Sequence, residues 1–323
     1  MRTALSAEGA LRALAQPGPP SVRREAAARL VEAARASDAP GDWAEEARRL
    51  LSDGDAEVRR AGVALLALQP GPVEALAARL ASALEDASPS VRLEAVGQLA
   101  DAASPQLRPV LALALQDGAF LVRFEAARGL AAIHHPAGLD VLAEGLDSPT
   151  LRFRAIGALA ELGDSRALAP LRRLFGRWLL NAFERTQAAG ALALFGDKDG
   201  EEYLLSRLRR RGALDRPLAA ELCGEAAVHA SEGTLLAMLA DASDKARGAA
   251  ARALGRLGSV RAGPVLERLL GDASVAEETR LDVAEALVFL HGAQAQGLLA
   301  AALASLPSAE GREELRALLE ELE

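Results

Sequence analysis

Residues able to do covalent or metal chemistry are few in this chain of 323 residues. The single cysteine is Cys223, in an apolar stretch, and the four histidines are His134, His135, His229 and His291. A lone cysteine in an apolar helix is usually a small buried hydrophobe, and the His134-His135 pair fits a helix end better than a metal site. No G-x-x-x-x-G-K-S/T loop occurs, and no G-x-G-x-x-G follows a strand. We therefore expect no catalytic residue, no metal and no cofactor.

The chain instead repeats a short motif, a small hydrophobic residue followed by Arg, along almost its whole length. The motif begins at Val22, Val58, Val91, Val122 and Leu151, and in altered form at Glu184, Leu214, Ala246 and Thr279. Successive copies lie 29 to 36 residues apart. Such a period indicates a solenoid, in which each repeat packs only on its neighbours.

Each repeat reads as two helices. In the third repeat, apolar or small residues at Val91, Ala95, Val96 and Leu99 follow the spacing of one helical face. A Ser-Pro pair then opens a second helix over 107–115. The glycines that would let neighbouring first helices approach closely are Gly97, Gly129, Gly157 and Gly190.

The pattern D-x-x-x-x-V-R-x-x-A-x-x-A-L, followed by G-D and a second apolar helix, resembles HEAT repeats of the short bacterial type named after phycobilisome (bilin) lyases. The resemblance implies an all-α, right-handed α-solenoid, a HEAT-like superhelix of about nine helix pairs. We expect one solenoid over 1–323, with a capping helix in 1–20, repeats over 21–306 and an acidic capping helix in 307–323. The paired His-Glu motifs of HEAT-like iron hydroxylases do not occur.

The resemblance also implies a role for the recurring arginines. In HEAT-type repeats this Arg pairs with an Asp of a turn and connects neighbouring repeats, and the candidate partners are Asp53, Asp86, Asp117 and Asp241. We favour this role over a basic ladder for an acidic ligand, because a residue present in every repeat serves the architecture. The recurring arginines are Arg23, Arg59, Arg92, Arg123, Arg152, Arg185, Arg247 and Arg280.

The residue that follows each recurring Arg varies, and the helical period turns it away from the buried stripe. In three consecutive repeats it is apolar, namely Leu93, Phe124 and Phe153. The resemblance implies that the first helix of each pair lines a concave surface. With helices about 8–10 Å apart, the three would form one exposed apolar stripe, the usual mark of a partner site. The sequence is equally compatible with both rings filling the core between repeats.

Aromatic and basic residues are concentrated in the middle of the chain. Eight of the ten aromatic residues lie between residues 120 and 203, and residues 151–216 carry a local charge of +5. Aromatic and Arg side chains are enriched at interface hot spots, although a bulkier core near the irregular connection 174–185 is the alternative. The partner-binding candidates of this region, besides the stripe, are Arg154, Arg172, Arg173, Trp178 and Arg185.

The densest basic run is Arg207-Leu208-Arg209-Arg210-Arg211. It ends a second helix, where cations complement the helix dipole, so a solvated face is the simpler interpretation. The other interpretation is a contact with phosphate or an acidic partner, for which Arg209 and Arg210 are the candidates.

Composition points to a soluble bacterial protein in a reducing compartment. One cysteine permits no internal disulfide, residues 1–18 do not resemble a signal peptide, and the longest apolar stretch, 298–306, is too short to span a bilayer. Two lysines against 35 arginines are typical of a high-GC bacterial genome. The net charge of −8 lies entirely in residues 264–323 and disfavours a nucleic-acid binder. We expect a cytoplasmic protein, monomeric on its own, that binds no membrane.

These observations favour a non-catalytic scaffold or adaptor, not an enzyme, that binds a protein partner on the concave face of its third to sixth repeats. The alternative is a bilin-lyase-like factor that modifies a client or handles a chromophore. A nucleic-acid-binding HEAT-like protein is a third possibility, which the net charge disfavours.

Overall fold

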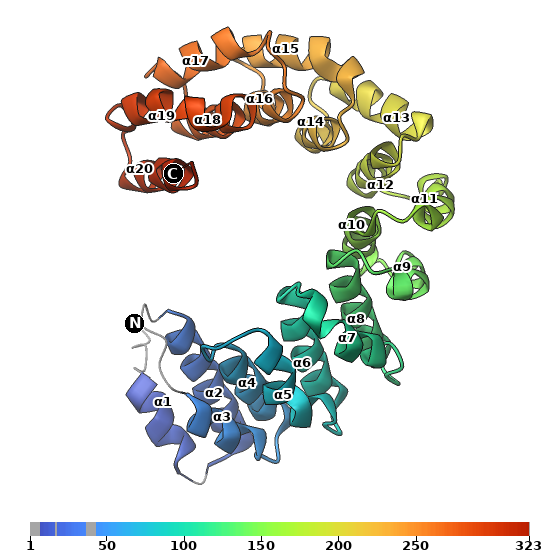
Figure 1. Ribbon diagram of the computed structural model, residues 1–323, viewed down its shortest axis with the longest axis vertical. Helices are drawn as coiled ribbons and strands as arrows, with labels where there is room; N and C mark the ends of the chain where they lie inside the picture. Colours follow the sequence, from blue (N-terminus) through green and yellow to red (C-terminus); the bar gives the residue numbers. More distant parts are fainter. Residues whose placement is uncertain (1–6, 17, 37–42, 323) are drawn as a thin grey trace. The chain divides into compact units, whose positions relative to one another are not determined.

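The computed structural model describes residues 7–16, 18–36 and 43–322. All regular structure in these residues is helical, and the expected helix pairs are present (Figure 1). Between α1 (Ala7–Leu14) and α20 (Ala309–Glu320), the nine pairs run from α2 to α19. In each pair the even-numbered helix comes first. Residues 1–6 of the expected N-terminal cap lie outside the described residues.

The chain divides into two compact units, residues 1–148 and 149–323. The pairs of unit 1 are α2 (Pro20–Arg35) and α3 (Ala44–Leu51), α4 (Ala56–Ala67) and α5 (Glu74–Leu84), α6 (Pro89–Asp101) and α7 (Arg108–Ala114), and α8 (Phe120–Ala132) and α9 (Leu139–Gly145). Its core lies between the two helix layers and draws leucines, valines and alanines from every pair.

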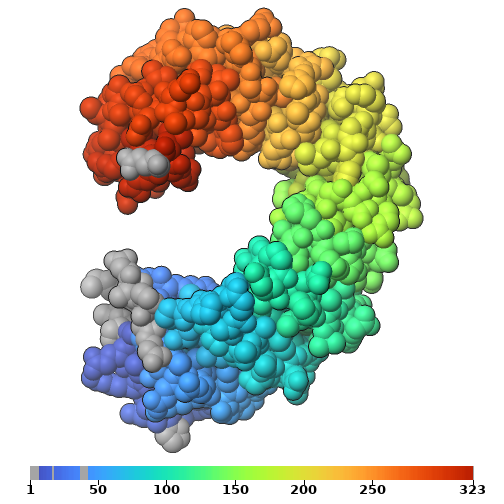
Figure 2. Space-filling view, in the orientation of Figure 1, coloured from blue at the N-terminus to red at the C-terminus, as the bar shows by residue number. Residues whose placement is uncertain are grey.

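Unit 2 holds five pairs and α20. The pairs are α10 (Arg152–Leu162) and α11 (Leu168–Phe175), α12 (Ala182–Leu194) and α13 (Lys198–Leu208), α14 (Arg216–Glu225) and α15 (Glu232–Ala240), α16 (Arg247–Arg256) and α17 (Gly263–Gly271), and α18 (Glu277–His291) and α19 (Gln296–Leu303). The first helices form one layer and the second helices the other (Figure 1). Within each unit, every repeat contacts its neighbours along the chain, so the surface colours of each unit follow the sequence order (Figure 2).

Two glycines on first helices occupy positions where a larger side chain would collide. A Cβ at Gly129 would lie 2.7 Å from the Cβ of Ala100, and one at Gly190 would lie 2.6 Å from a methyl of Leu222. The expected close approach is therefore confirmed at these positions. It is wrong at Gly97, which has open space around its Cβ position, and at Gly157, which meets only the end of a glutamine side chain at 4.0 Å.

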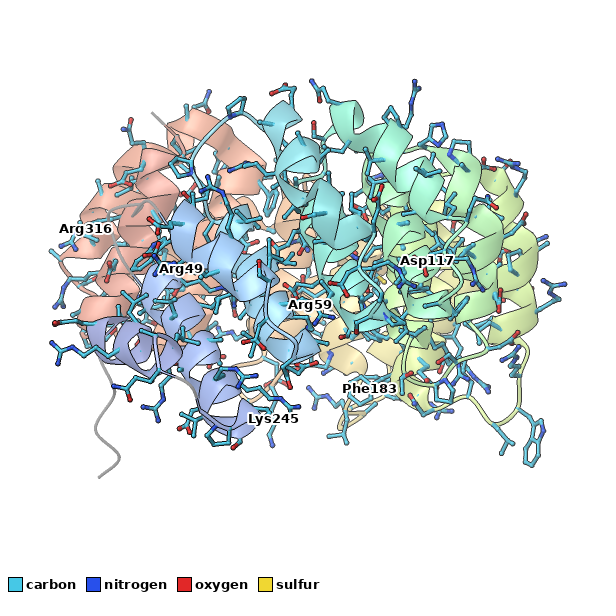
Figure 3. The ribbon with its side chains drawn as sticks, turned by 90° about the horizontal axis from the view of Figure 1, so that it is seen from below. Arg49, Arg59, Asp117, Phe183, Lys245 and Arg316 are labelled. Carbon is cyan, nitrogen blue, oxygen red and sulfur yellow. The ribbon has the colours of Figure 1, made fainter. Side chains whose placement is uncertain are left out.

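The turns between repeats join side-chain ion pairs to backbone hydrogen bonds. Arg59 Nε donates to Asp86 at 2.7 Å, while its Nη1 donates to the carbonyl of Asp53 at 2.8 Å. Asp86 also accepts from the backbone N–H of Ser88 at 2.7 Å, which orders the turn before α6. The same pairing joins Arg23 to Asp53 and Arg92 to Asp117, at 2.8 and 2.7 Å. The predicted structural role is thus confirmed for Arg23, Arg59 and Arg92, whereas Arg123 donates to the backbone carbonyl of Asp117 at 3.0 Å instead. Figure 3 labels Arg59 and Asp117.

In unit 2 the predicted pairing of a recurring arginine with a turn Asp is not kept. Arg247 and Arg280 donate to the backbone carbonyls of Leu239 and Leu270. Arg152 pairs with Glu184 at 2.9 Å, and Arg216 pairs with Asp244 at 2.7 Å. In the seventh repeat, the arginine that pairs with the next repeat is therefore Arg216, two residues after Leu214, where the motif was expected to begin. Asp241, an expected partner of a recurring arginine, accepts a hydrogen bond from Arg211 instead.

The ion pairs of unit 1 predict a dependence of stability on pH. The Arg59 and Arg92 guanidinium groups lower the pKa of Asp86 and Asp117 below the ordinary value of 3.8. A carboxyl with a lowered folded-state pKa stabilises the fold above its unfolded-state pKa and loses that contribution as pH falls through the folded-state value. We expect urea midpoints to fall between about pH 5 and pH 2, and to fall less for Asp117→Asn. Midpoints that are flat across this range would contradict the expectation.

One segment, Glu277–Leu303, contains an 18-residue window with a mean hydropathy of 1.4 and is therefore a candidate membrane span by length and composition. The structure divides it into α18 and α19, with Gly292 at a φ of 55° between them. Val283, Leu287 and Leu299 are fully buried in the core of unit 2. These three residues pack between repeats, and 28% of the most apolar window is buried.

Candidate partner-binding surface

The predicted apolar stripe is not formed as expected. Phe124 is completely buried, with its ring centroid 6.2 Å from that of Phe120, so the core interpretation is correct for this residue. Leu93 is half-buried against the core of unit 1. Phe153 is 52% exposed and belongs to unit 2. Phe153 is the second residue of α10, whereas Phe124 is the fifth residue of α8.

Two of the candidate arginines are bonded to other residues of unit 2. Arg172 pairs with Asp197 at 2.6 Å, and Arg185 Nη2 donates to the carbonyl of Arg177 at 2.5 Å. The Arg185 bond fixes the connection that precedes α12. Arg154, in the first turn of α10, is exposed.

The other candidate cations are exposed at the ends of second helices. They are Arg173, in the last turn of α11, and Arg209 and Arg210, which follow α13. None of the three takes part in an ion pair with another residue of the described ranges. These cations are therefore available to an external anion.

Three connections form what we call the loop edge of unit 2, defined as residues 176–181, 209–215 and 241–246. They lead into α12, α14 and α16, which pack side by side in the first-helix layer. Because adjacent packed helices lie about 8–10 Å apart, the connections at their N-terminal ends are neighbours. Figure 3 shows Phe183 and Lys245 at this same edge.

The loop edge and the adjoining first turn of α12 expose large apolar side chains. Trp178 and Leu214 are each 83% exposed, Leu179 is 76% exposed, and Phe183 in the first turn of α12 is 46% exposed. Only Trp178 is among the candidates from the sequence. The signal that could have found Leu179 is the apolar run Trp178-Leu179-Leu180 just ahead of a helix cap. For Leu214, no sequence signal distinguishes an exposed leucine from a core residue.

A capping box explains why this apolar run stays outside the helix. Asn181 Oδ1 accepts from the backbone N–H of Glu184 at 2.9 Å, and Glu184 accepts from the backbone N–H of Asn181 at 3.4 Å. This reciprocal pair sets the start of α12 at Ala182. The tryptophan and leucine before it are left on the surface.

The residues with possible covalent or metal chemistry lie away from this edge. His135 Nδ1 accepts from the backbone N–H of Ala137 at 3.4 Å, in the turn after α8, so it has the expected capping role. Over residues 7–16, 18–36 and 43–322, no group of three or more His, Cys, Asp or Glu side chains is arranged to hold a metal ion.

Cys223 is fully buried in α14, as expected, and burial raises the pKa of its thiol to about 12. The thiolate is the reactive form of cysteine, so we expect very slow reaction with a disulfide reagent in the native protein at pH about 8. Absorbance with Ellman's reagent, read with and without guanidinium, measures this difference. Native labelling as fast as that of free cysteine would contradict it.

Comparison with known sequences identifies the class of protein. The HEAT-repeat family matches residues 76–153 and 202–288, together more than half of the chain. The PBS lyase HEAT-like repeat matches residues 151–176. The chain therefore belongs to the HEAT-repeat family. No curated protein matches it.

Solved structures share the solenoid fold. Kap95 in its complex with Nup1 is 14% identical with a TM-score of 0.55, and the match covers 99% of this chain and 51% of Kap95. Escherichia coli YibA is 18% identical with a TM-score of 0.48, covering 88% and 92% of the two chains. A structure of the complex of CpcE and CpcF of phycocyanin lyase from Nostoc matches at 18% identity and a TM-score of 0.47, covering 79% and 96%. The chain thus spans about half the length of Kap95.

Proposed function

We propose that this chain is a non-catalytic scaffold that binds a protein partner through the exposed apolar residues of unit 2. The observation that carries the proposal is the exposure of Phe153, Trp178, Leu179, Phe183 and Leu214. Apolar side chains gathered on a folded surface and flanked by cations are typical of partner sites. The proposed binding surface differs from the expected concave stripe because Phe124 is buried.

The architecture supports a binding role. The first helices α12, α14 and α16 each pack on both neighbouring first helices, and ion pairs such as Arg152–Glu184 connect successive repeats, so the exposed ends of these helices are displayed in a set geometry. A preorganised surface loses little conformational entropy on association. Kap95, which is similar in fold, is a HEAT solenoid captured with a protein, Nup1. Bilin handling through covalent attachment to Cys223 is disfavoured by the burial of that thiol. We expect the protein to act in the cytoplasm.

The test is capture of proteins from a nuclease-treated lysate on immobilised wild-type chain and on Trp178→Ser/Phe183→Ser. The matched control is Val260→Ser, because Val260 is 82% exposed in the connection before α17. Circular dichroism first establishes that all three proteins are equally helical. A partner identified by mass spectrometry should be retained by the control and lost by the double variant. Equal capture by all three proteins would contradict the proposed surface.

A further inference from the structure

A pocket of about 440 Å³ opens on the loop edge, between the connections that lead into α14 and α16. Its residues include Arg211, Leu214, Arg216, Asp244 and Lys245. Leu214 supplies an apolar side chain that the fold leaves in solvent. The pocket has the size for one large side chain of a partner, and its rim is charged.

The acidic groups of this pocket are already neutralised. Arg216 donates to Asp244 at 2.7 Å, and Arg211 is hydrogen-bonded to Asp241. Lys245, by contrast, has no ion-pair partner within the part of the chain that the structure describes. Arg209 and Arg210 lie just before the pocket in the chain and are likewise exposed. The pocket therefore presents an excess of positive charge.

Two helix N-termini meet the pocket and add to this potential. Pro217 and Ala246 line it, at the starts of α14 and α16, and each helix has ten residues. Neither Asp215 nor Ala246, the residues at the two N-caps, forms a side-chain cap, although Asp244 Oδ1 accepts from the backbone N–H of Ala246 at 3.0 Å. Asp215 is engaged elsewhere, by Arg207 and by Thr186 at 2.6 Å. A helix N-terminus favours a nearby negative charge.

We propose that this pocket takes an acidic peptide segment of the partner, with one large apolar side chain in the pocket and Asp or Glu residues on either side of it. The apolar side chain packs on Leu214. The flanking carboxylates pair with Lys245, Arg209 and Arg210. Charge-assisted hydrogen bonds of this kind are stronger than hydrogen bonds between neutral groups. The inference rests on the proposed scaffold function and names the chemistry of the partner.

The test uses a phage-displayed random peptide library, panned on the full chain. The selected peptides are then measured by fluorescence anisotropy against wild type and Leu214→Ser/Lys245→Glu. We expect acidic peptides with a single Leu, Phe or Trp, whose affinity falls at least about ten-fold in the variant, a change of about 1.4 kcal/mol. The control Val260→Ser/Arg268→Glu likewise removes one apolar and one cationic side chain, from exposed sites outside the pocket, and should bind as wild type does.

Several outcomes would overturn the pocket proposal. They are selection of neutral or basic peptides, equal affinity for wild type and pocket variant, and no enrichment at all. Pocket-dependent binding to phosphatidylserine vesicles in place of peptides would also overturn it, and would assign the edge to an anionic lipid surface. A lysate partner whose binding depends on Trp178 but not on Leu214 or Lys245 would support the scaffold function and contradict only the proposed role of the pocket.

Discussion

Phe124→Ala is expected to lower the free energy of unfolding by about 3–5 kcal/mol, the usual range for truncation of a buried aromatic ring. The ring is fully buried and lies beside Phe120, so its removal leaves a cavity that the packed helices fill only in part. Urea denaturation followed by circular dichroism at the helical signal measures the change. The loss should appear as an earlier transition midpoint.

Phe153→Ala is the matched control for this prediction. The same side chain is truncated in the corresponding position after a recurring arginine, but this ring is half-exposed. A surface truncation of this kind usually changes stability by no more than about 0.5 kcal/mol. Equal losses in the two variants would contradict the assignment of Phe124 to the core and of Phe153 to the surface.

Arg216→Ala is expected to destabilise unit 2 by about 3 kcal/mol, because it leaves the carboxylate of Asp244 without its cation. The side chains of Arg216 and Asp244 are only 9% and 4% exposed. Arg216 also donates from Nε to the carbonyl of Leu208 at 2.7 Å. Its loss therefore removes a backbone contact and an ion pair together, and thermal unfolding should begin at a lower temperature.

Arg211→Ala supplies the comparison within the same connection. Arg211 is paired with Asp241, but its side chain is 74% exposed, and exposed ion pairs contribute about 0–1 kcal/mol. We expect a melting temperature close to that of wild type. An Arg211 variant as unstable as the Arg216 variant would show that the two ion pairs do not differ in burial as described.

The turn chemistry of unit 1 could be predicted in detail, whereas that of unit 2 could not. The repeats that carry Arg59 and Arg92 keep the motif, so their pairing with Asp86 and Asp117 follows from the resemblance. In the seventh repeat, the motif position holds Leu214 and the connecting arginine lies two residues later. Periodicity cannot detect that shift, because the length of the connection 209–215 decides where the next helix begins.

The loop edge was only partly predictable. Trp178, Arg209 and Arg210 stand out in the sequence because tryptophan is rare here and the basic run is dense. Leu214 and Lys245 do not, since a single leucine or lysine has no distinguishing pattern. Their significance depends on the packing of α14 against α16, which brings the two connections together around one pocket.

The family, the helix pairs and the ion pairs Arg23–Asp53, Arg59–Asp86 and Arg92–Asp117 of unit 1 could be predicted from the amino-acid sequence alone, because each depends on residues within about one repeat of one another. Only the tertiary structure decided which apolar side chains face solvent. Phe124 and Phe153 occupy the same place in the motif, yet one is core and the other surface. Exposure depends on how far the first helix extends ahead of the residue and on what packs over it, and no local pattern encodes either.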